Sequence, residues 1–383
     1  MSIKITMDLK TKAINLHKRH QGKLKVASKI PLRNLKDLSL VYTPGVGAVS
    51  SLIAKNKKLV RDLTFKRNSV AVVSDGSAVL GLGNIGPEAA LAVMEGKAVI
   101  FKEFADIDAI PIVLNTQDSE KIIEIVKAIS PTFGGINLED ISAPRCFEIE
   151  ERLKKELDIP VMHDDQHGTA IVVLAALVNA ARVVKKKFSN LKVVISGVGP
   201  AGAATAKLLL KASIKNIIII DSKGIISTKR QDLLPYKKEL VKITNPKKLS
   251  GDCNKAIENA DVFIGLSRPN VLLSSDVKKM AKSAIVFAMA NPIPEIMPDV
   301  AKKAGAAIVA TGRSDFPNQI NNALVFPGVF RGALDHQVRQ ITDKMKMKAA
   351  YALAGLIKKP NPNKIVPSIF DKRLVKTVAK VIR

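Results

Sequence analysis

Two pairs of neighbouring carboxylates are the residues in this chain best suited to chemistry. Glu139 and Asp140 end the segment GGINLEDI, and Asp164 and Asp165 lie in MHDDQHG. Neighbouring residues on a regular strand face opposite sides, so both members of a pair reach one ion only at an irregular strand end. A site made of three such carboxylates and no thiolate suits Mg²⁺ or Mn²⁺, and it leaves coordination positions on the ion for substrate and water. The alternative is that these residues only cap helices, whose first turns favour Asp and Glu.

Two histidines flank the second acidic pair, His163 and His167. Either could be a metal ligand, because imidazole is a common one. Histidines in such positions are more often hydrogen-bonded behind the ligands or in the core, and we favour that interpretation.

The segment LKVVISGVGPAGAATAK has the spacing of a dinucleotide-binding turn. Gly197, Gly199 and Gly202 come directly after an apolar strand-like segment and begin a helix-like one. In this GxGxxG pattern the first glycine allows the tight turn, the second lets the backbone approach a pyrophosphate, and the third permits close packing of the helix. A glycine-rich turn that only packs tightly is the alternative.

The residues after the next strand bear on the choice of cofactor. Asp221 ends the segment IKNIIIID, where its carboxylate can accept hydrogen bonds from the ribose hydroxyls. A carboxylate there favours NAD, because it repels the 2′-phosphate of NADP, but Lys223 could neutralise that phosphate. The sequence therefore predicts NAD or NADP and favours NAD.

The elements that position these residues form an α/β pattern. Apolar segments ending in turn residues alternate with helical patterns from about Val70 to Val309, which predicts mainly parallel sheets. In the first half the strand-like segments are VAVVSDG, AVIF, IPIVLN, GGINLED and IPVMHDD, with helix-like segments such as GPEAALAVMEG and SEKIIEIVKAIS between them. Ligands bind at the carboxyl ends of the strands in such sheets, which is where both acidic pairs lie.

A second series predicts a doubly wound Rossmann-type domain. It begins with the helix-like HGTAIVVLAALVNAARVV and continues through LKVVISG, IKNIIIID, ADVFIGL, SAIVFAMAN and AAIVATG. Gly168 and a potential cap at Thr169 mark the boundary. We expect an N-terminal α/β substrate- and metal-binding domain at 1–165 and a dinucleotide-binding domain at 166–383, whose tail beyond Phe330 is helical with a break at KKPNPNK.

The bulk composition agrees with a globular protein of two domains. The chain has 383 residues, of which 47% are hydrophobic and 25% charged, which argues against disorder. The longest apolar run, from about Ala170 to Val184, is shorter than the roughly 20 residues of a membrane span and is expected to be a buried helix. The N-terminus has no export signal, so we expect a cytoplasmic protein without a membrane partner. Cys146 and Cys253 indicate neither a disulfide framework nor a zinc site.

The formal charge of +27 is the unusual bulk feature. A basic surface can attract nucleic acid, anionic lipid or an acidic substrate. The lysines are scattered along the chain, and there is no Trp to serve as a stacking platform, so we expect no specific nucleic-acid partner. A positive field can also steer small dianions toward a cleft.

Several motifs stand together in order: YTPGVG, SDGSAVLGLGNIGPEAALAVMEGK, FADID, NLEDI, HDDQHGTA, GVGPAGAA, ANPIPEI and FPNQINNALVFPG. With them the chain resembles the malic enzymes in their short bacterial and archaeal form, from about Thr43 to about Asp335. The resemblance implies oxidative decarboxylation of (S)-malate to pyruvate and CO₂ with reduction of NAD or NADP, dependence on Mg²⁺ or Mn²⁺, and a homodimer or larger homo-oligomer.

The resemblance also implies roles at the acidic pairs. Glu139, Asp140 and Asp165 match the family's metal ligands. Lys97, in MEGK, matches the base that takes the hydroxyl proton, and Asp164 matches the carboxylate that orients it. A partly desolvated lysine near a cation can have a lowered pKa, so we expect one here. Without the resemblance, Lys97 would be a solvated lysine before a strand.

Three further positions follow from the family pattern. Tyr42 matches the acid that protonates the enol after CO₂ leaves, and Asn291 and Asn321 match residues that bind the substrate carboxylate. Larger malic enzymes have an arginine that grips this carboxylate where the present chain has Ala78. Ser77, backbone amides or the asparagines are candidates to replace it.

Two other functions are also compatible with the sequence. A metal-independent hydroxy-acid or amino-acid dehydrogenase could use the same nucleotide domain, and its activity would survive EDTA. A basic nucleic-acid-binding protein could use the Rossmann-type domain only as a scaffold, since a fold alone does not determine function.

Overall fold

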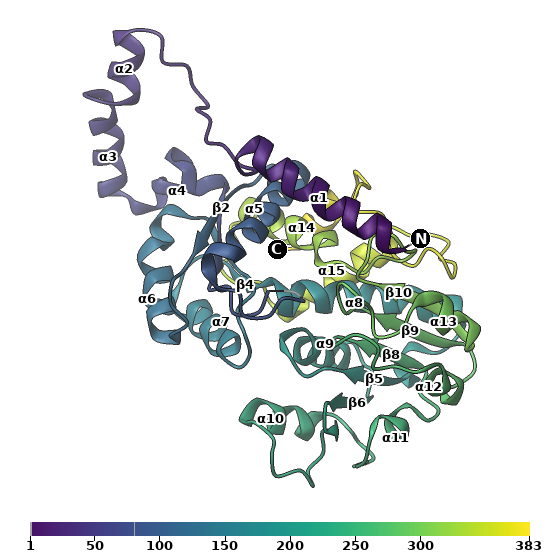
Figure 1. Ribbon diagram of the computed structural model, residues 1–383. Coiled ribbons are helices and arrows are strands. Elements are labelled where there is room, and N and C mark those ends of the chain that lie inside the picture. The colour runs from purple at the N-terminus through teal and green to yellow at the C-terminus, as the bar shows by residue number, and fades with distance from the viewer. Residues whose placement is uncertain (1, 80) are drawn as a thin grey trace.

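The molecule is built on two parallel sheets joined by one long buried helix (Figure 1). The computed structural model describes residues 2–79 and 81–383, apart from the side chains of residues 2–7. Leu80, which belongs to the motif DGSAVLGLG, lies outside the described residues. The expected α/β class with mainly parallel sheets is confirmed.

The first sheet has four parallel strands in the order β2-β1-β3-β4. Its strands are β1 (Ser69–Ser74), β2 (Asp108–Val113), β3 (Gly135–Leu138) and β4 (Val161–His163). The helices that connect and cover them are α5 (Gly86–Ala105), α6 (Ser119–Ile129) and α7 (Arg145–Glu156). The strands β1 and β3 are buried along their whole length, which explains their continuous apolar character.

One predicted strand of the first half is wrong. The segment AVIF lies inside α5, whose helix continues from Gly86 to Ala105. Ala98 and Phe101 are buried on the same face as Met94, so the apolar residues follow the spacing of one helix. A short apolar run does not distinguish a buried helix from a strand. Lys97 is therefore a buried residue within a helix instead of a solvated residue before a strand.

The second sheet has six strands in the order β10-β9-β8-β5-β6-β7, and only the edge strand β7 is antiparallel. The strands are β5 (Lys192–Ser196), β6 (Asn216–Asp221), β7 (Gly224–Ile225), β8 (Val262–Gly265), β9 (Ala284–Ala288) and β10 (Ala306–Thr311). Its helices are α9 (Pro200–Lys211), α10 (Pro235–Ile243), α11 (Cys253–Ile257), α12 (Ser274–Lys279) and α13 (Pro298–Lys303). The strand order reverses at β5, the place where doubly wound sheets bind nucleotides.

The helix α8 (Asp164–Val183) connects the two sheets and is buried along most of its length. The sequence predicted its start near His167, but it begins at Asp164. The second acidic pair therefore occupies the first turn of a helix that directly follows β4, where the helix dipole favours negative charge. The expected burial of the run from Ala170 is confirmed.

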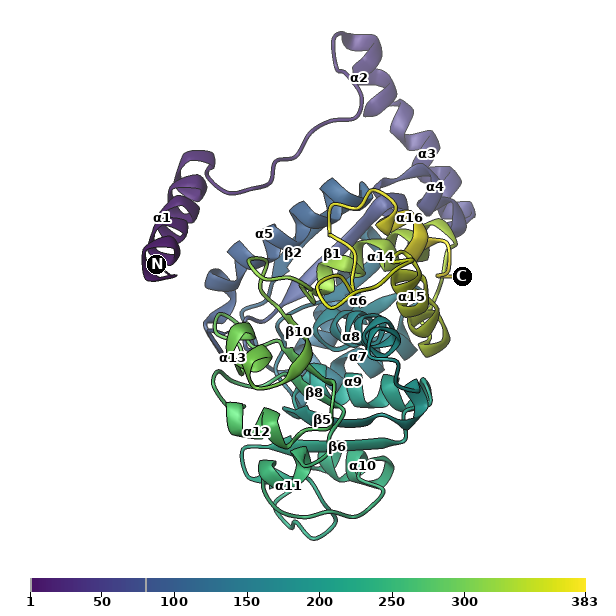
Figure 2. The ribbon, with the colours of Figure 1, turned by 90° about the vertical axis from the view of Figure 1, so that its right-hand side faces the viewer.

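The C-terminal helices return to the first sheet. They are α14 (Phe326–Asp335), α15 (Asp343–Gly355) and α16 (Leu374–Ala379), and the expected break at KKPNPNK separates the last two. The rings of Phe326 and Phe330 pack edge-on against Phe101 of α5, with centroids 4.7 Å and 5.4 Å away. The C-terminal helices, which follow the second sheet in the chain, thus complete the hydrophobic core beside the first sheet (Figure 2).

The N-terminal helices α2 (Leu35–Val41) and α3 (Gly45–Lys55) project from the body of the molecule (Figures 1 and 2). The helices α1 (Ser2–His20) and α4 (Val60–Leu63) lie on either side of them in the chain. None of the residues of α2 and α3 is buried, although many are apolar. Among the described residues, two helical segments, 35–55 and α8, are long and apolar enough to cross a membrane. This signal is weak, because buried core helices of soluble proteins share it.

Candidate active site

Three carboxylates converge where β3 ends and α8 begins. Glu139 and Asp140 follow the last residue of β3, and Asp165 lies in the first turn of α8. One oxygen from each lies within 4.8 Å of the others. Asp140 adopts a left-handed backbone conformation with φ of 53°, and its N–H donates a hydrogen bond of 2.8 Å to Oδ2 of Asp165. This irregular backbone lets two neighbouring side chains face one point, as the sequence required.

The electrostatics of the cluster suit a divalent cation. Burial raises the pKa of Glu139 well above its ordinary value, even though Lys97 opposes the shift. Burial and the charge of Asp165 raise the pKa of Asp140 to about 8. Oδ2 of Asp140 is buried without a hydrogen-bond partner among the described residues. Three crowded oxygen donors with one unsatisfied are the ligand set that Mg²⁺ or Mn²⁺ prefers, so the residues present fit the expected metal.

Lys97 borders this cluster. Its Nζ lies 2.6 Å from Oδ2 of Asp164 and 2.7 Å from Oε1 of Glu139. The amine also lies 4.3 Å from the centre of the Phe326 ring, on its face. The side chains of Lys97 and Asp164 are only 8% and 0% exposed, so the pair is removed from water. Asp164 therefore holds the lysine amine at the edge of the three carboxylates.

The pKa of Lys97 does not follow the sequence expectation of a lowered value. Burial by itself lowers it, but Asp164, Glu139 and Asp165 together raise the pKa above its ordinary range. We expected a lowered pKa because the sequence does not show that three carboxylates surround this one amine. A divalent cation on Glu139 and Asp165 would withdraw two of these three attractions.

A small cavity of about 220 Å³ opens beside Asp165. Asn291 and Asn321 both line it, and so does Ala78. The peptide bond between Asn291 and Pro292 is cis. Asn321 begins a short helical turn and accepts a hydrogen bond of 2.8 Å from the N–H of Ala323. The structure therefore brings both asparagines to the cavity beside Asp165, Asn291 from the segment after β9 and Asn321 from the segment after β10.

The glycine turn lies between β5 and α9, in the predicted strand–turn–helix context. Gly197 has φ of 112°, a left-handed conformation that favours glycine. A Cβ on Gly202 would lie 2.0 Å from the carbonyl oxygen of Gly197, whereas a Cβ on Gly199 would meet nothing within 4 Å. Gly202 is thus needed for close packing of the turn, while Gly199 borders open space at the helix N-terminus, where a pyrophosphate would bind.

Asp221 and Lys223 line a larger cavity of about 780 Å³ with Gly197. The carboxylate of Asp221 forms ion pairs with Nη1 of Arg230 at 2.7 Å and with Nζ of Lys237 at 2.8 Å. Although burial opposes the shift, these cations hold the pKa of Asp221 below its ordinary value. Lys223 pairs instead with Asp232 at 2.9 Å. The negative charge at this position is therefore already compensated.

Comparison with known proteins explains this combination of sites. Residues 21–154 match the family model "Malic enzyme, N-terminal domain", and residues 166–382 match "Malic enzyme, NAD binding domain". The chain belongs to the malic enzyme family. It is an oxidoreductase that decarboxylates malate with NAD or NADP. The two alternative hypotheses, a metal-independent dehydrogenase and a nucleic-acid-binding scaffold, are not favoured.

Individual malic enzymes are similar over almost the whole chain. The NAD-dependent malic enzyme of Geobacillus stearothermophilus is 56% identical over 94% of this chain and 76% of its own length. The bifunctional malic/malolactic enzyme of Bacillus subtilis (strain 168) is 54% identical over 98% and 92%. The crystal structure of the NAD-dependent malic enzyme from Thermotoga maritima has a TM-score of 0.94 and 49% identity, covering 97% of this chain and 98% of that one.

The two histidines lie behind the malic enzyme carboxylates, on different sides. His163 is fully buried, with Nε2 3.4 Å from Oδ2 of Asp165. Neither of its ring nitrogens has a hydrogen-bond partner among the described residues. His167 points away from the cluster and contacts Glu150 at 2.9 Å. His167 is thus hydrogen-bonded behind the carboxylates, as the favoured interpretation expected, whereas His163 is a buried core residue whose ring lacks the expected hydrogen bond among the described residues.

Sequence reasoning missed Arg145, the first residue of α7. Its Nη2 donates hydrogen bonds of 2.8 Å to Asp75 and 2.9 Å to Ser77. Its Nε is buried without a partner among the described residues. Ser77 is the neighbour of Ala78 in the malic enzyme motif, so an arginine does stand close to that position. The motif SAPRCFEIE follows the NLEDI carboxylates directly, and this proximity was the available signal.

Tyr42 is the one malic enzyme position that the fold does not bring to the site of its own chain. It lies between α2 and α3, in the part of the molecule that projects from the body (Figure 2). The residue is 66% exposed. It lines none of the cavities described above.

Proposed function

We propose that Lys97 is the base of the malate reaction and that Asp164 orients it. The observation that carries this proposal is the position of the Lys97 amine, within hydrogen-bond distance of both Asp164 and the edge of the carboxylate cluster. A base must lie within reach of the proton it takes. In its uncharged form, which a divalent cation on Glu139 and Asp165 would favour, the Lys97 amine takes the proton of the malate C2 hydroxyl. Bound NAD or NADP would accept the hydride from C2.

Glu139, Asp140 and Asp165 would hold Mg²⁺ or Mn²⁺ in this proposal. A bound ion would supply a Lewis acid for the C2 oxygen and for the negative charge that loss of the carboxylate leaves behind. The chain itself binds and orients malate: the cavity beside Asp165 is lined by the side chains of Asn291 and Asn321, which can donate hydrogen bonds to a substrate carboxylate.

Arg145 is our candidate for the group that replaces the arginine absent at Ala78. Ser77, a candidate from the sequence, is engaged, since it donates to Asp75 and accepts from Arg145 and from the N–H of Ser142. Arg145 keeps a buried Nε without a partner among the described residues. An arginine offers a planar fork that suits a carboxylate.

Tyr42 would act in the site of a second copy of the chain, within a homodimer. The helices α2 and α3 expose an apolar surface formed by Leu35, Leu38, Leu40, Val41, Val46, Val49 and Leu52. Apolar surface of this extent on projecting helices favours burial against a partner. Tyr42 lies within it, so a dimer that covers this surface would carry the tyrosine to another subunit. There its hydroxyl protonates C3 of the enol that remains after CO₂ leaves.

For the cofactor we propose a preference for NAD, with NADP also accepted. Asp221 supports NAD because a carboxylate at the ribose repels a 2′-phosphate. Arg230 and Lys237 support acceptance of NADP, since they compensate this charge and could turn to the phosphate. Lys223 is less suitable than the sequence indicated, because it already pairs with Asp232.

We also propose a division into domains at residues 165 and 166, a cytoplasmic location, and no specific nucleic-acid or membrane partner. The scattered distribution of the lysines and arginines supports the last point. The separate family models for 21–154 and 166–382 are compatible with the division.

The experiment that tests the proposed function follows absorbance at 340 nm with L-malate and Mn²⁺, in parallel with NAD and with NADP. Pyruvate and lactate are assayed as products, and an EDTA sample is the control. We expect EDTA-sensitive reduction of the cofactor with formation of pyruvate. Cofactor reduction that survives EDTA, or that yields only oxaloacetate, would instead support the hypothesis of a metal-independent dehydrogenase.

A further inference from the structure

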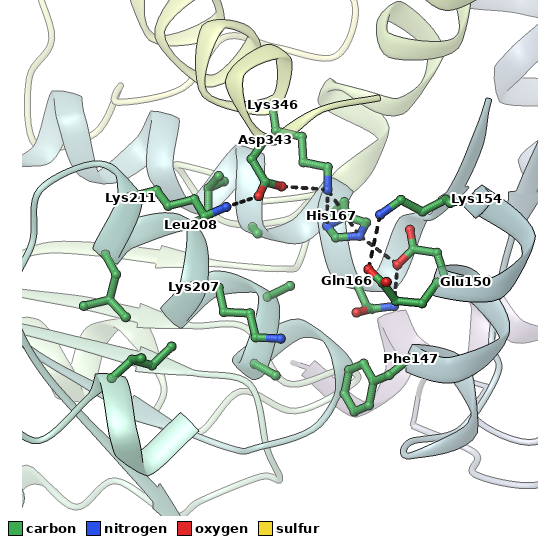
Figure 3. Close-up of a pocket in the computed structure, with 16 residues that line it drawn as sticks. Phe147, Glu150, Lys154, Gln166, His167, Lys207, Leu208, Lys211, Asp343 and Lys346 are labelled. Carbon is green, nitrogen blue, oxygen red and sulfur yellow. Dashed lines mark hydrogen bonds and ion pairs between the residues drawn. The ribbon is translucent and has the colours of Figure 1, made fainter. Parts of the chain in front are cut away.

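Another large cavity lies beside α8, where Gln166, His167 and Ala170 contribute to its lining (Figure 3). Its volume is about 750 Å³. It is formed by α7 of the first sheet, by α8, by α9 and α10 of the second sheet, and by the C-terminal helix α15. It shares no lining residue with the cavities beside Asp165 and Asp221. The malic enzyme reaction as described above uses none of its residues.

Four lysines line this cavity: Lys154, Lys207, Lys211 and Lys346. Lys207 extends into it from α9, and no ion-pair partner is found for its amine among the described residues (Figure 3). Lys211 lies one helical turn further on the same face and forms an ion pair with Asp343. The cavity therefore has an uncompensated positive group at its centre and further amines around it.

Lys346 contributes a buried charged group to the lining of the cavity. Its side chain is 4% exposed, and its Nζ lies 3.0 Å from Nδ1 of His167 and 3.2 Å from Oδ1 of Asp343. Burying an ammonium group costs free energy unless it is paired. This one is compensated in part by Asp343, whose side chain is 44% exposed, and by the nearby charge of Glu150, with which it forms no direct ion pair. An anion in the cavity would complete its environment.

Apolar side chains also line a large part of the cavity. Phe147, Ala170, Ala203, Ala204, Leu208, Leu210 and Ile243 contribute to it. Three acidic residues also line the cavity, and each is already engaged. Glu150 accepts hydrogen bonds within its own network, Glu151 pairs with Lys154 and Lys155, and Asp343 pairs with Lys211 and Lys346. None of these pairs includes Lys207. Amines beside an apolar lining suit a ligand that combines anionic groups with an apolar body.

A hydrogen-bond network leads from this cavity to the carboxylates of the active site. Glu150 is 4% exposed and accepts hydrogen bonds from the N–H of His163 at 3.0 Å and from Nε2 of Gln166 at 3.1 Å. Nε2 of His167 lies 2.9 Å from the same carboxylate. Glu150 thus fixes the residues on either side of Asp164 and Asp165, while His167 also contacts Lys346.

We propose that this cavity binds a small organic anion, with phosphate or carboxylate groups on an apolar body, and that the bound anion alters the affinity of the active site for malate. The anion contacts Lys207 and Lys346. Its contact with Lys346 changes how His167 and Glu150 hold the first turn of α8. The binding part stands by itself, whereas the effect on malate rests on the proposed function.

Binding is tested by calorimetry on the intact chain, saturated with NAD, with phenyl phosphate and with isophthalate as separate probes. The two probes distinguish a phosphate from a carboxylate ligand. We expect at least one to bind, and Lys207→Ala to weaken it about tenfold, the cost of losing a charge-assisted contact. Lys215→Ala, at another exposed lysine, is the matched control and should leave affinity unchanged. Binding of neither probe, or equal binding to Lys207→Ala, would overturn the proposal.

The coupling is tested by measuring the KM for malate with and without the probe that binds. We expect the KM to change in the wild-type chain and to stay constant in Lys207→Ala, whose basal activity should be unchanged. A probe that binds but leaves the KM unchanged would refute the coupling. If the chain does not turn over malate at all, the calorimetry still decides the binding part, so the two failures are distinguishable.

Discussion

The backbone N–H of Asp140 donates a hydrogen bond of 2.8 Å to the carboxylate of Asp165. This contact ties the end of β3 to the first turn of α8, across a helix and a strand of the chain. It aligns three carboxylates at one point, with Lys97 at their edge.

Replacing Lys97 with Met should lower kcat by about 10²–10⁴, because a positioned base contributes that much to a proton transfer. The measurement is the steady-state rate of pyruvate formation, with circular dichroism to verify folding, since Asp164 loses its buried partner. Lys102→Met, on the exposed part of the same helix, is the control and should keep its rate. Equal rates in both variants would refute the role of Lys97.

Replacing Asp165 with Asn should weaken Mn²⁺ binding more than about tenfold, since an amide oxygen is neutral but occupies the same volume. The Asn side chain can still accept the hydrogen bond from Asp140, so the fold should be retained. The free Mn²⁺ concentration, followed by electron paramagnetic resonance, measures this without reference to activity. Asp158→Asn, at a residue whose side chain is 88% exposed, is the matched control. Unchanged Mn²⁺ affinity in Asp165→Asn would exclude it as a ligand.

The two glycines of the turn should behave differently when changed to Ala. At Gly199 the added Cβ meets nothing within 4 Å, so the free energy of unfolding should change by less than about 0.5 kcal/mol. The affinity for NAD should nevertheless fall, because the methyl group occupies the approach of the pyrophosphate. At Gly202 the Cβ would lie 2.0 Å from a carbonyl oxygen, so the variant should lose about 1–3 kcal/mol.

Urea unfolding and fluorescence titration with NADH measure the two effects. A Gly199→Ala chain that binds NADH like the wild type would argue against a pyrophosphate at this turn.

Mixing two inactive variants should restore activity if Tyr42 acts in a partner's site. Tyr42→Phe and Lys97→Met are each expected to be inactive alone. In hybrid dimers one site combines both defects and the other is intact, so an equal mixture should recover about a quarter of the wild-type rate. The mixture is unfolded and refolded together to exchange subunits, and sedimentation verifies the dimer. No recovery in a mixture that sediments as dimers would indicate that Tyr42 does not act in the partner's site.

Changing Arg145 to Lys should raise the KM for malate about tenfold while kcat changes much less, because lysine keeps the charge but loses the planar fork. Arg152→Lys, further along α7 and paired with Glu120 and Glu156 on the surface, is the control. An unchanged KM in Arg145→Lys would leave the asparagines as the groups that hold the substrate carboxylate.

Features that depend on local spacing could be predicted from the amino-acid sequence. The glycine turn between β5 and α9 could be recognised because its strand, glycines and helix are contiguous. The family could be recognised from the order of its motifs. The two acidic pairs could be proposed as one cluster, because the carboxyl ends of neighbouring parallel strands meet at one edge.

Features that depend on residues far apart in the chain could not be predicted from local patterns and were seen only in the folded molecule. The segment AVIF became part of a helix because Phe101 packs against Phe326 and Phe330, which a local pattern cannot show. The pKa of Lys97 is raised because folding buries it between Glu139 and Asp164. The proximity of Arg145 to Ser77, the projection of Tyr42 and the lysine-lined cavity likewise arise from packing between separate elements, and packing contacts carry no signature in the spacing of a single segment.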